Sequence, residues 1–265
     1  MIAGAASVKS CCADLYASDW ARLLLGDCLH PGGTALTARL GQLMELEPGS
    51  MVLDVASGRG ASAIHLAREL DCVVVGADYG AANAAAARRQ AIAAGVNGQA
   101  VFAVGDAERL PFPDGRFDAV VCECAFCTFP DKPAAAEEMQ RVLRPGGVVG
   151  LADLVRRGPL PAGLDDLLAW IACVADARAP EEYVGHLASV GLMVTTIESH
   201  DQALADLVRT VRLRLVGARL AAHIGGVAPS PVGLARAREL GRAAERAVAA
   251  GSLGYALIVA RKPLT

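Results

Sequence analysis

The sequence lacks an uninterrupted apolar stretch long enough to cross a membrane. Although 54% of the 265 residues are hydrophobic, alanine inflates that share, and charged residues interrupt every long apolar run before the roughly 18 residues that a membrane span needs. The opening MIAGAASVKS has neither a charged start nor a sustained apolar core, so it does not resemble a secretory signal. We therefore expect a soluble, cytoplasmic protein with no membrane partner.

The sequence also lacks a surplus of basic residues. Its formal net charge is −3, and residues of both signs are mixed along the chain. A nucleic-acid-binding surface needs a basic patch that neutralises phosphates. The charge balance therefore argues against a nucleic-acid partner, while the length is ample for a hydrophobic core.

A third absence concerns the thiols, because no C-x-x-C pair is matched by a second pair at zinc-finger spacing. The eight cysteines are Cys11, Cys12, Cys28, Cys72, Cys122, Cys124, Cys127 and Cys173. Without an export signal we expect them to be reduced. Free cysteine is often a small buried hydrophobe, which is our interpretation of Cys28 and Cys72.

What the sequence does contain is a strand that runs into a glycine turn. Residues 51–60 read MVLDVASGRG, which predicts a buried strand, a tight turn and then a helix. Glycine at Gly58 and Gly60 lets a ligand approach the backbone closely. The helix that follows directs its free N–H groups to the same place, so we interpret this stretch as a cofactor-binding turn.

Strands and helices alternate along the rest of the chain. Helices are predicted at 61–70, 81–95 and 132–144, and further strands at 72–78, 99–106, 117–124, 147–153, 192–199 and 255–261. This alternation predicts an α/β fold with a doubly wound, mostly parallel seven-stranded sheet of Rossmann-like type, covered by helices on both faces.

The chain divides into four predicted segments. Residues 1–46 form an N-terminal helical lid with HPGG at 30–33 as a hinge, residues 47–200 the cofactor-binding core, residues 201–250 a helical insert, and residues 251–265 the final strand. Two consecutive edge strands are ordinarily joined by a few residues. We therefore interpret the insert as a cap or a dimerisation element, which makes a homodimer one expected assembly.

Acidic residues mark three successive predicted strands. Asp54 lies inside the first, Asp78 ends the second and Asp106 ends the third. Ligands of an open parallel sheet bind outside the carboxyl ends of its strands, so these side chains and the glycine turn should meet in one crevice. One such acid alone could be a helix cap, whereas three beside Gly58 and Gly60 favour a ribose-binding cofactor site.

This pattern resembles class I S-adenosylmethionine-dependent methyltransferases over roughly residues 46–262. The motifs that carry the resemblance are VLDVASGRG, the acid of VVVGADY, the block VGDAERLPFPDGRFDAV, and VLRPGG. The resemblance implies S-adenosylmethionine as cofactor, with Asp78 on the ribose hydroxyls, Asp106 and Ala107 at the adenine amine, and Gly58 near the methionine moiety. The cofactor-binding set is then Asp54, Ala56, Ser57, Gly58, Asp78, Tyr79, Asp106, Ala107 and Glu123.

One position departs from the family pattern. The family usually has glycine where Ala56 stands, so the turn must tolerate a methyl group there. The alternative, a Rossmann dehydrogenase, needs G-x-G-x-x-G, which DVASGRGAS does not supply.

The remaining cysteines gather where an acceptor would approach the methyl group. Strand alternation places Cys122 and Cys124 on one face with Glu123 on the other, so Glu123 receives no role as a metalloid ligand. Soft thiolates select soft, thiophilic ions. The candidate catalytic cysteines are Cys124, Cys173, Cys11, Cys12, Cys122 and Cys127.

The stretch CECAFCTFPDKPAAAEEMQRVLRPGG is similar to the corresponding part of arsenite methyltransferases. That resemblance implies that Cys124 and Cys173 are thiolate ligands of trivalent arsenic, whose lone pair attacks the methyl group. The family's further cysteine has no counterpart, since Ser57 stands in the glycine loop. The third thiolate would come from Cys11, Cys12, Cys122 or Cys127, and antimony, mercury, selenium or an organic thiol remain alternative acceptors.

Two other functions stay open. In one, the acceptor is a small organic molecule, and His30, His186 or Asp153 is the general base. In the other, the protein is a non-catalytic thiol-based metal binder on a methyltransferase scaffold. Tyr16 and Trp20 either cover the sulfonium or hold the N-terminal helix to the core.

Overall fold

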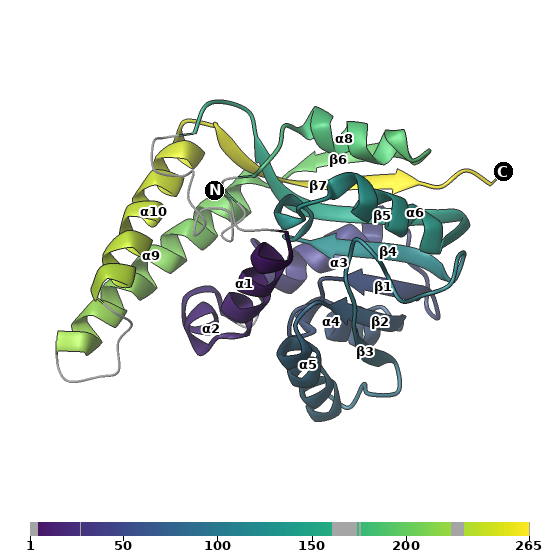
Figure 1. Ribbon diagram of the computed structural model, residues 1–265, viewed down its shortest axis with the longest axis horizontal. Helices are drawn as coiled ribbons and strands as arrows, with labels where there is room; N and C mark the ends of the chain where they lie inside the picture. The colour runs from purple at the N-terminus through teal and green to yellow at the C-terminus, as the bar shows by residue number, and fades with distance from the viewer. Residues whose placement is uncertain (1–4, 27, 161–173, 175, 224–230, 265) are drawn as a thin grey trace.

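A seven-stranded sheet forms the centre of the molecule (Figure 1). The computed structural model describes residues 5–26, 28–160, 174, 176–223 and 231–264. The strands are β1 (Met51–Val55), β2 (Val73–Asp78), β3 (Ala100–Val104), β4 (Phe117–Glu123), β5 (Leu143–Arg156), β6 (Met193–Ser199) and β7 (Leu253–Arg261). Their spatial order is β3-β2-β1-β4-β5-β7-β6, which confirms the predicted α/β sheet.

The last strand in the chain does not lie at the edge of the sheet. The pairs from β3 to β5 are parallel, whereas β7 inserts between β5 and β6 and runs antiparallel to both. Several boundaries differ from the prediction by a few residues, among them two in the sheet. The fifth strand begins at Leu143, where it pairs with Phe117, and the third ends at Val104, so that Asp106 lies in the loop beyond it.

Helices cover both faces of the sheet. They are α1 (Ala5–Ala17), α2 (Asp19–Leu25), α3 (Gly33–Leu43), α4 (Ala61–Glu69), α5 (Ala81–Ala93), α6 (Lys132–Val142), α8 (Pro180–Ser189), α9 (Asp201–His223) and α10 (Pro231–Ala249), with a short 3-10 turn, η1, at Phe126–Thr128. One core joins α3, α4 and α5 to the sheet, and the other joins α6 and α8 to its opposite face.

Local sequence explains where these helices begin. Asp131 caps α6 by accepting a hydrogen bond from the Ala134 N–H at 3.0 Å, and Pro133 occupies the first turn, where its missing N–H is not needed. The HPGG break precedes α3, because Gly32 and Gly33 have φ of 73° and 53°, values that disfavour other residues. Its role as a hinge stays a prediction.

Helices α1 and α2 lie beyond the carboxyl ends of the parallel strands, at the same end of the sheet as the arm formed by α9 and α10 (Figure 1). The arm is the predicted helical insert, and its two helices pack on each other. The Arg214 guanidinium donates to the Leu24 carbonyl at 2.9 Å and so connects α9 to α2. The predicted break at GGVAPSP falls largely on residues 224–230, which lie outside the described residues.

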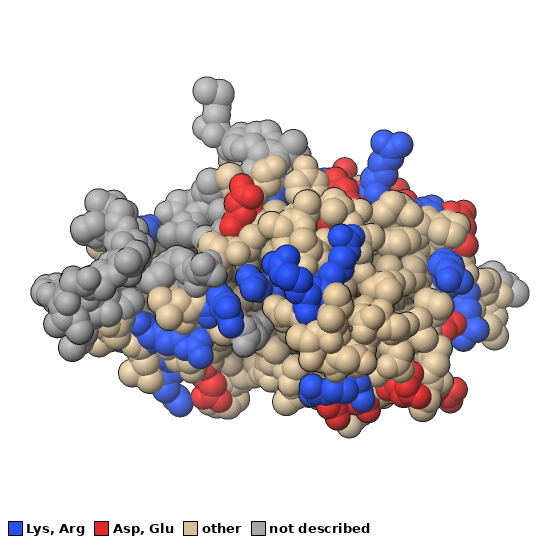
Figure 2. All heavy atoms as spheres, turned by 90° about the horizontal axis from the view of Figure 1, so that it is seen from below, with Lys and Arg blue, Asp and Glu red and all other residues tan. Residues whose placement is uncertain are grey.

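The described surface that is visible in Figure 2 carries basic side chains scattered among acidic and neutral ones. Within the described part of the chain, the helices are all too short or too polar to traverse a bilayer.

Candidate functional site

Residues of the turn after β1 have positive φ angles. Ala56 has a φ of 58°, in the left-handed region, and Gly58 and Gly60 have φ of 53° and 85°. A Cβ on Gly60 would lie 2.7 Å from the Phe102 ring, so close packing as well as φ requires glycine there. Ala56 therefore carries its methyl group in a conformation that favours glycine.

The Asp78 carboxylate organises this turn from the end of β2. Its Oδ2 accepts from the Gly58 N–H at 2.8 Å, and its Oδ1 accepts from the Gly80 N–H at 2.8 Å and from Asn83 Nδ2 at 3.0 Å. Burial raises the pKa of Asp78, and these hydrogen bonds oppose the shift. A carboxylate offers about four lone-pair sites, so about one of them remains for a hydroxyl group of a ligand.

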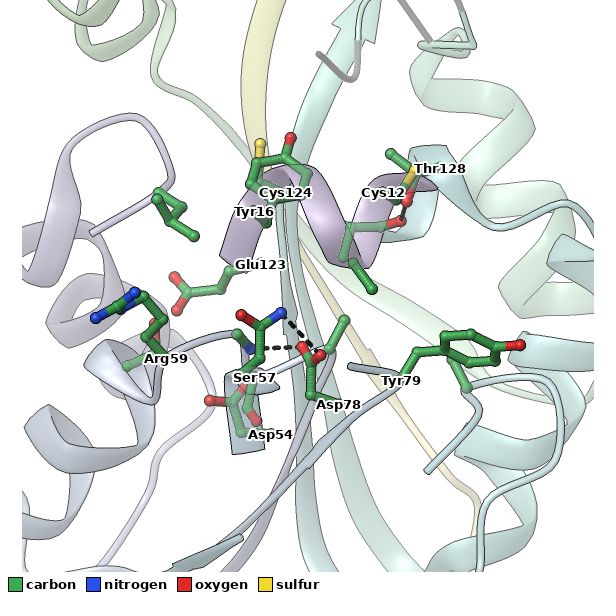
Figure 3. A pocket seen from close by; sticks show the side chains of 18 of the residues that line it. Cys12, Tyr16, Asp54, Ser57, Arg59, Asp78, Tyr79, Glu123, Cys124 and Thr128 are labelled. Atoms are coloured by element: carbon green, nitrogen blue, oxygen red, sulfur yellow. Dashed lines mark hydrogen bonds between the residues drawn. The ribbon is translucent and has the colours of Figure 1, made fainter. Parts of the chain in front are cut away.

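One pocket gathers the predicted cofactor residues (Figure 3). All of them line it: Asp54, Ala56, Ser57, Gly58, Asp78, Tyr79, Asp106, Ala107 and Glu123. The structure thus brings the set together, and the role of each residue stays a prediction.

Several buried polar atoms in this pocket lack a partner among the described residues. They are Asp54 Oδ2, Ser57 Oγ, Arg59 Nε and Asn83 Oδ1. Asp54 is only 2% exposed, and its pKa is raised well above the usual range by burial and then by the neighbouring Glu123 and Asp78 carboxylates. Unsatisfied buried polar groups are rare in native proteins, so this wall is suited to a polar, cationic ligand.

Sequence reasoning missed two further groups in the pocket. From α1, Lys9 Nζ lies 2.7 Å from Asp106 Oδ2 and 2.5 Å from Glu108 Oε2. Nothing local to Lys9 signals this contact, because its partner Asp106 lies 97 residues away in the sequence. Arg59 also lines the pocket, on the side opposite Tyr79 in Figure 3. It lies within the glycine motif, and its basic side chain at that position is the signal by which it could have been found.

The cysteines separate into two groups. Cys12 and Cys124 line the pocket, whereas Cys122 and Cys127 are fully buried in the two cores. Cys11 is partly exposed and does not line the pocket. Cys173 lies outside the described residues.

The predicted alternation of Cys122 and Cys124 is wrong for a backbone reason. Cys124 has a φ of 53°, which ends the strand and turns its side chain towards the pocket beside Glu123. Cys122 instead faces the α6 side of the sheet, and its pKa is raised well above the usual range by burial and then by nearby carboxylates, with Asp153 first. A thiol in that position does not reach the pocket.

Cys127 is likewise held away from the pocket. Its backbone N–H donates to Asp153 Oδ2 at 2.9 Å, and its side chain lies in the core. Within the described ranges, no group of three or more His, Cys, Asp or Glu residues forms a metal site. For the thiols interpreted as structural, Cys72 fits, since burial raises its pKa to about 11, and Cys28 is partly buried.

Of the three predicted general bases, His30 lines the pocket. His186 on α8 packs against the Phe126 ring with centroids 6.0 Å apart, and burial lowers its pKa. Asp153 is buried beneath η1. Tyr16 lines the pocket, whereas the side chain of Trp20 lies outside the described part.

Comparison with known proteins agrees with this geometry. The family described as a methyltransferase domain matches residues 53–151. The 27-O-demethylrifamycin SV methyltransferase of Amycolatopsis mediterranei is 32% identical over 241 residues, which cover 89% of this chain and 85% of that protein. The arsenite methyltransferase of Halobacterium salinarum is 29% identical over 161 residues, covering 60% of this chain and 41% of that protein.

A solved structure extends the likeness of fold. Phosphoethanolamine N-methyltransferase 2 of Haemonchus contortus, in complex with phosphomonomethylethanolamine and S-adenosylhomocysteine, superposes with a TM-score of 0.77 at 18% identity, over 95% of this chain and 57% of that one.

The chain belongs to the class I S-adenosylmethionine-dependent methyltransferases. Its cofactor is S-adenosylmethionine, which supplies an activated methyl group on a sulfonium. The pocket fits this cation, because buried carboxylates with free lone pairs line the wall and Asp78 retains acceptor capacity for a hydroxyl group. Enzymes of this class act chiefly by binding and orienting the two reactants, so the side chains around the acceptor decide what is methylated.

Proposed function

We propose that the chain methylates a thiophilic metalloid, with trivalent arsenic as the model acceptor, held by the thiolates of Cys12 and Cys124. The supporting observation is that these two thiols, from α1 and from the loop after β4, line the same pocket as the cofactor residues. In Figure 3 both lie above Asp54 and Asp78. Cys173 is the further ligand that the likeness to arsenite methyltransferases implies.

The chemistry balances without another reactant. Each thiol that binds arsenite displaces one hydroxide from the arsenic, and the thiol proton leaves with that hydroxide as water, so that the sulfur binds as a thiolate. The metalloid lone pair forms a bond to the methyl carbon, while the bond between that carbon and the sulfonium breaks. Its electron pair stays on sulfur and gives neutral S-adenosylhomocysteine, while the positive charge passes to the arsenic atom, whose formal oxidation state rises from three to five in the methylated product.

The test measures S-adenosylhomocysteine formed from S-adenosylmethionine and arsenite in the presence of glutathione. Cys124→Ser and Cys12→Ser should each lose turnover by about a hundredfold, because a hydroxyl is a poor ligand for a soft ion, and should bind S-adenosylhomocysteine normally. Cys11→Ser is the matched control, since Cys11 adjoins Cys12 but does not line the pocket, and it should keep its rate. Wild-type rates in both pocket variants would contradict the proposal.

A second acceptor class is favoured by one comparison. The rifamycin relative matches 89% of the chain, and its name describes transfer to an oxygen of an organic molecule. In this reading the acceptor is an organic hydroxyl and His30 takes its proton. The same assay with a panel of polyphenols and polyketide alcohols decides between the two: rates independent of Cys12 and Cys124 but abolished in His30→Asn would support the hydroxyl acceptor.

A further inference from the structure

The loop that carries Cys124 has a backbone that its own sequence does not favour. Cys124 has a φ of 53°, and a non-glycine residue stays in the left-handed region only where its surroundings enforce it. The loop continues into η1, where the N–H and Oγ1 of Thr128 donate to the Ala125 carbonyl at 2.9 and 2.7 Å. Because Cys124, Ala125, Thr128 and Phe129 all line the pocket, we call residues 124–129 the acceptor wall.

The last residue of the acceptor wall is tied to a buried lysine. The Phe129 carbonyl accepts a hydrogen bond from Lys132 Nζ at 3.1 Å. The same ammonium forms an ion pair with the Asp176 carboxylate, and the side chains of that pair are only 6% and 8% exposed. Asp176 also accepts a hydrogen bond from the Arg178 guanidinium. One ammonium therefore joins the acceptor wall to a segment that lies beyond β5 in the chain.

Neither the helix nor its solvation accounts for a lysine at this position. Lys132 is the first residue of α6, where the helix dipole disfavours a positive charge, and a lysine is seldom buried unless it is paired. The segment that pairs with it is fixed to the sheet, since the Arg156 N–H donates to the Arg178 carbonyl at 2.8 Å and Val155 forms a bridge with Arg178. Lys132 thus connects the acceptor wall to a rigid support.

We propose that Lys132 and Asp176 are positioning residues for the methyl acceptor, because they fix the Phe129 carbonyl and through it the wall that carries Cys124. The inference deepens the proposed function and rests on it for the role of Cys124 as an acceptor ligand. When the wall is loosened, Cys124 relaxes from its left-handed backbone, and its thiol shifts within the pocket and opens to solvent. The cofactor residues after β1 and β2 are not part of this wall and keep their positions.

The test follows the Cys124 thiol directly. Peptide mass spectrometry on the full chain measures the rate at which iodoacetamide alkylates Cys124, with Cys11, which does not line the pocket, as the internal reference. Lys132→Met should speed the alkylation of Cys124 about tenfold, the scale of one hydrogen bond to a charged group, and leave Cys11 unchanged. The calorimetric affinity for S-adenosylhomocysteine should stay within about twofold of wild type.

Lys262→Met is the matched control. Lys262 Nζ donates to the Gln140 and Leu143 carbonyls at 2.8 and 2.7 Å, at the opposite end of α6 from the acceptor wall. The variant therefore loses a comparable contact between a lysine and backbone carbonyls. It should alkylate Cys124 at the wild-type rate, and an equal acceleration in both lysine variants would overturn the proposal.

A double variant separates positioning from stability. Lys132→Met with Asp176→Asn removes both charges of the pair and so recovers part of the stability, but the Phe129 carbonyl still lacks the ammonium. Alkylation of Cys124 should therefore stay fast in the double variant. Alkylation that slows towards the wild-type rate as the stability recovers would show that the pair is merely structural and would overturn the proposal, as would wild-type rates in both variants.

Turnover gives a second readout. With arsenite and glutathione, Lys132→Met and the double variant should each lower kcat/KM for arsenite about tenfold, with the half-saturating concentration of S-adenosylmethionine unchanged. If the wild type does not methylate arsenite, the proposed function fails, while the alkylation rates still decide whether Lys132 holds the wall. If the wild type methylates arsenite and Lys132→Met keeps both its turnover and its alkylation rate, only the positioning role fails.

Discussion

Replacing Ala56 with glycine should be nearly neutral for stability, unlike most alanine-to-glycine changes. Ala56 has a φ of 58°, and a non-glycine residue in the left-handed region costs about 1–2 kcal/mol. Glycine loses this strain but gives up about 0.4–1 kcal/mol through the greater freedom of the unfolded chain. The half-buried methyl adds a loss of about 0.4 kcal/mol, half of the value for a fully buried group.

These terms place Ala56→Gly between a loss of about 0.4 and a gain of about 1.2 kcal/mol in the free energy of unfolding. Ala63→Gly is the matched comparison, because Ala63 is fully buried in α4. There the lower helix propensity of glycine costs about 1 kcal/mol and the lost methyl about 0.8 kcal/mol.

Thermal denaturation of the two variants beside wild type measures the difference. At a thermal shift of about 2–4 °C per kcal/mol, Ala56→Gly should melt within a few degrees of wild type or above it, and Ala63→Gly clearly below. If Ala56→Gly lost as much stability as Ala63→Gly, the left-handed backbone at Ala56 would not store strain that glycine relieves.

Two further predictions concern buried charge. Because the pKa of Asp54 is raised above 3.8 by burial and by Glu123 and Asp78, its contribution to stability is greatest below pH 3.8 and is lost as the pH rises through the folded value. Asp54→Asn should therefore melt higher than wild type at pH 8 without cofactor, by a margin that shrinks towards pH 4; a margin independent of pH would contradict this. The Lys132 and Asp176 side chains, 6% and 8% exposed, form an ion pair, and Lys132→Met should lower the free energy of unfolding in urea by about 1.5–3 kcal/mol, because the buried Asp176 carboxylate loses one of its cationic partners and keeps Arg178. Adding Asp176→Asn to that variant should recover part of the loss, and a change under about 1 kcal/mol in Lys132→Met would refute the argument.

The sheet and the glycine turn were predictable from the sequence because both depend on short-range patterns. Alternating strands and helices leave few topologies, and acids after parallel strands must converge at one edge. The direction of the Cys124 side chain was not predictable by alternation, because its left-handed backbone ends the strand and places Cys124 in the pocket beside Glu123.

Long-range contacts were the other limit. Lys9 and Asp106 meet only because α1 packs beyond the carboxyl ends of the strands, and no periodicity in either segment encodes that meeting. His30 lies within a motif that was visible in the sequence, but the approach of its Nε2 to within 3.7 Å of Glu123 Oε2 depends on how the N-terminal segment packs. Sequence patterns therefore predicted the residues at the strand ends that line the cofactor pocket, but not the side chains that the N-terminal segment brings to it.

The position of β7 has a consequence for how the protein is made. Strand β6 is at the edge of the sheet, and β7 is its neighbour there. Until residues 253–261 have emerged from the ribosome, β5 and β6 both present unpaired backbone groups, which invite pairing with other chains. The sheet therefore cannot be completed before residues 253–261 have been synthesised, and a chain interrupted before this strand leaves the edges of β5 and β6 open to pairing with other chains.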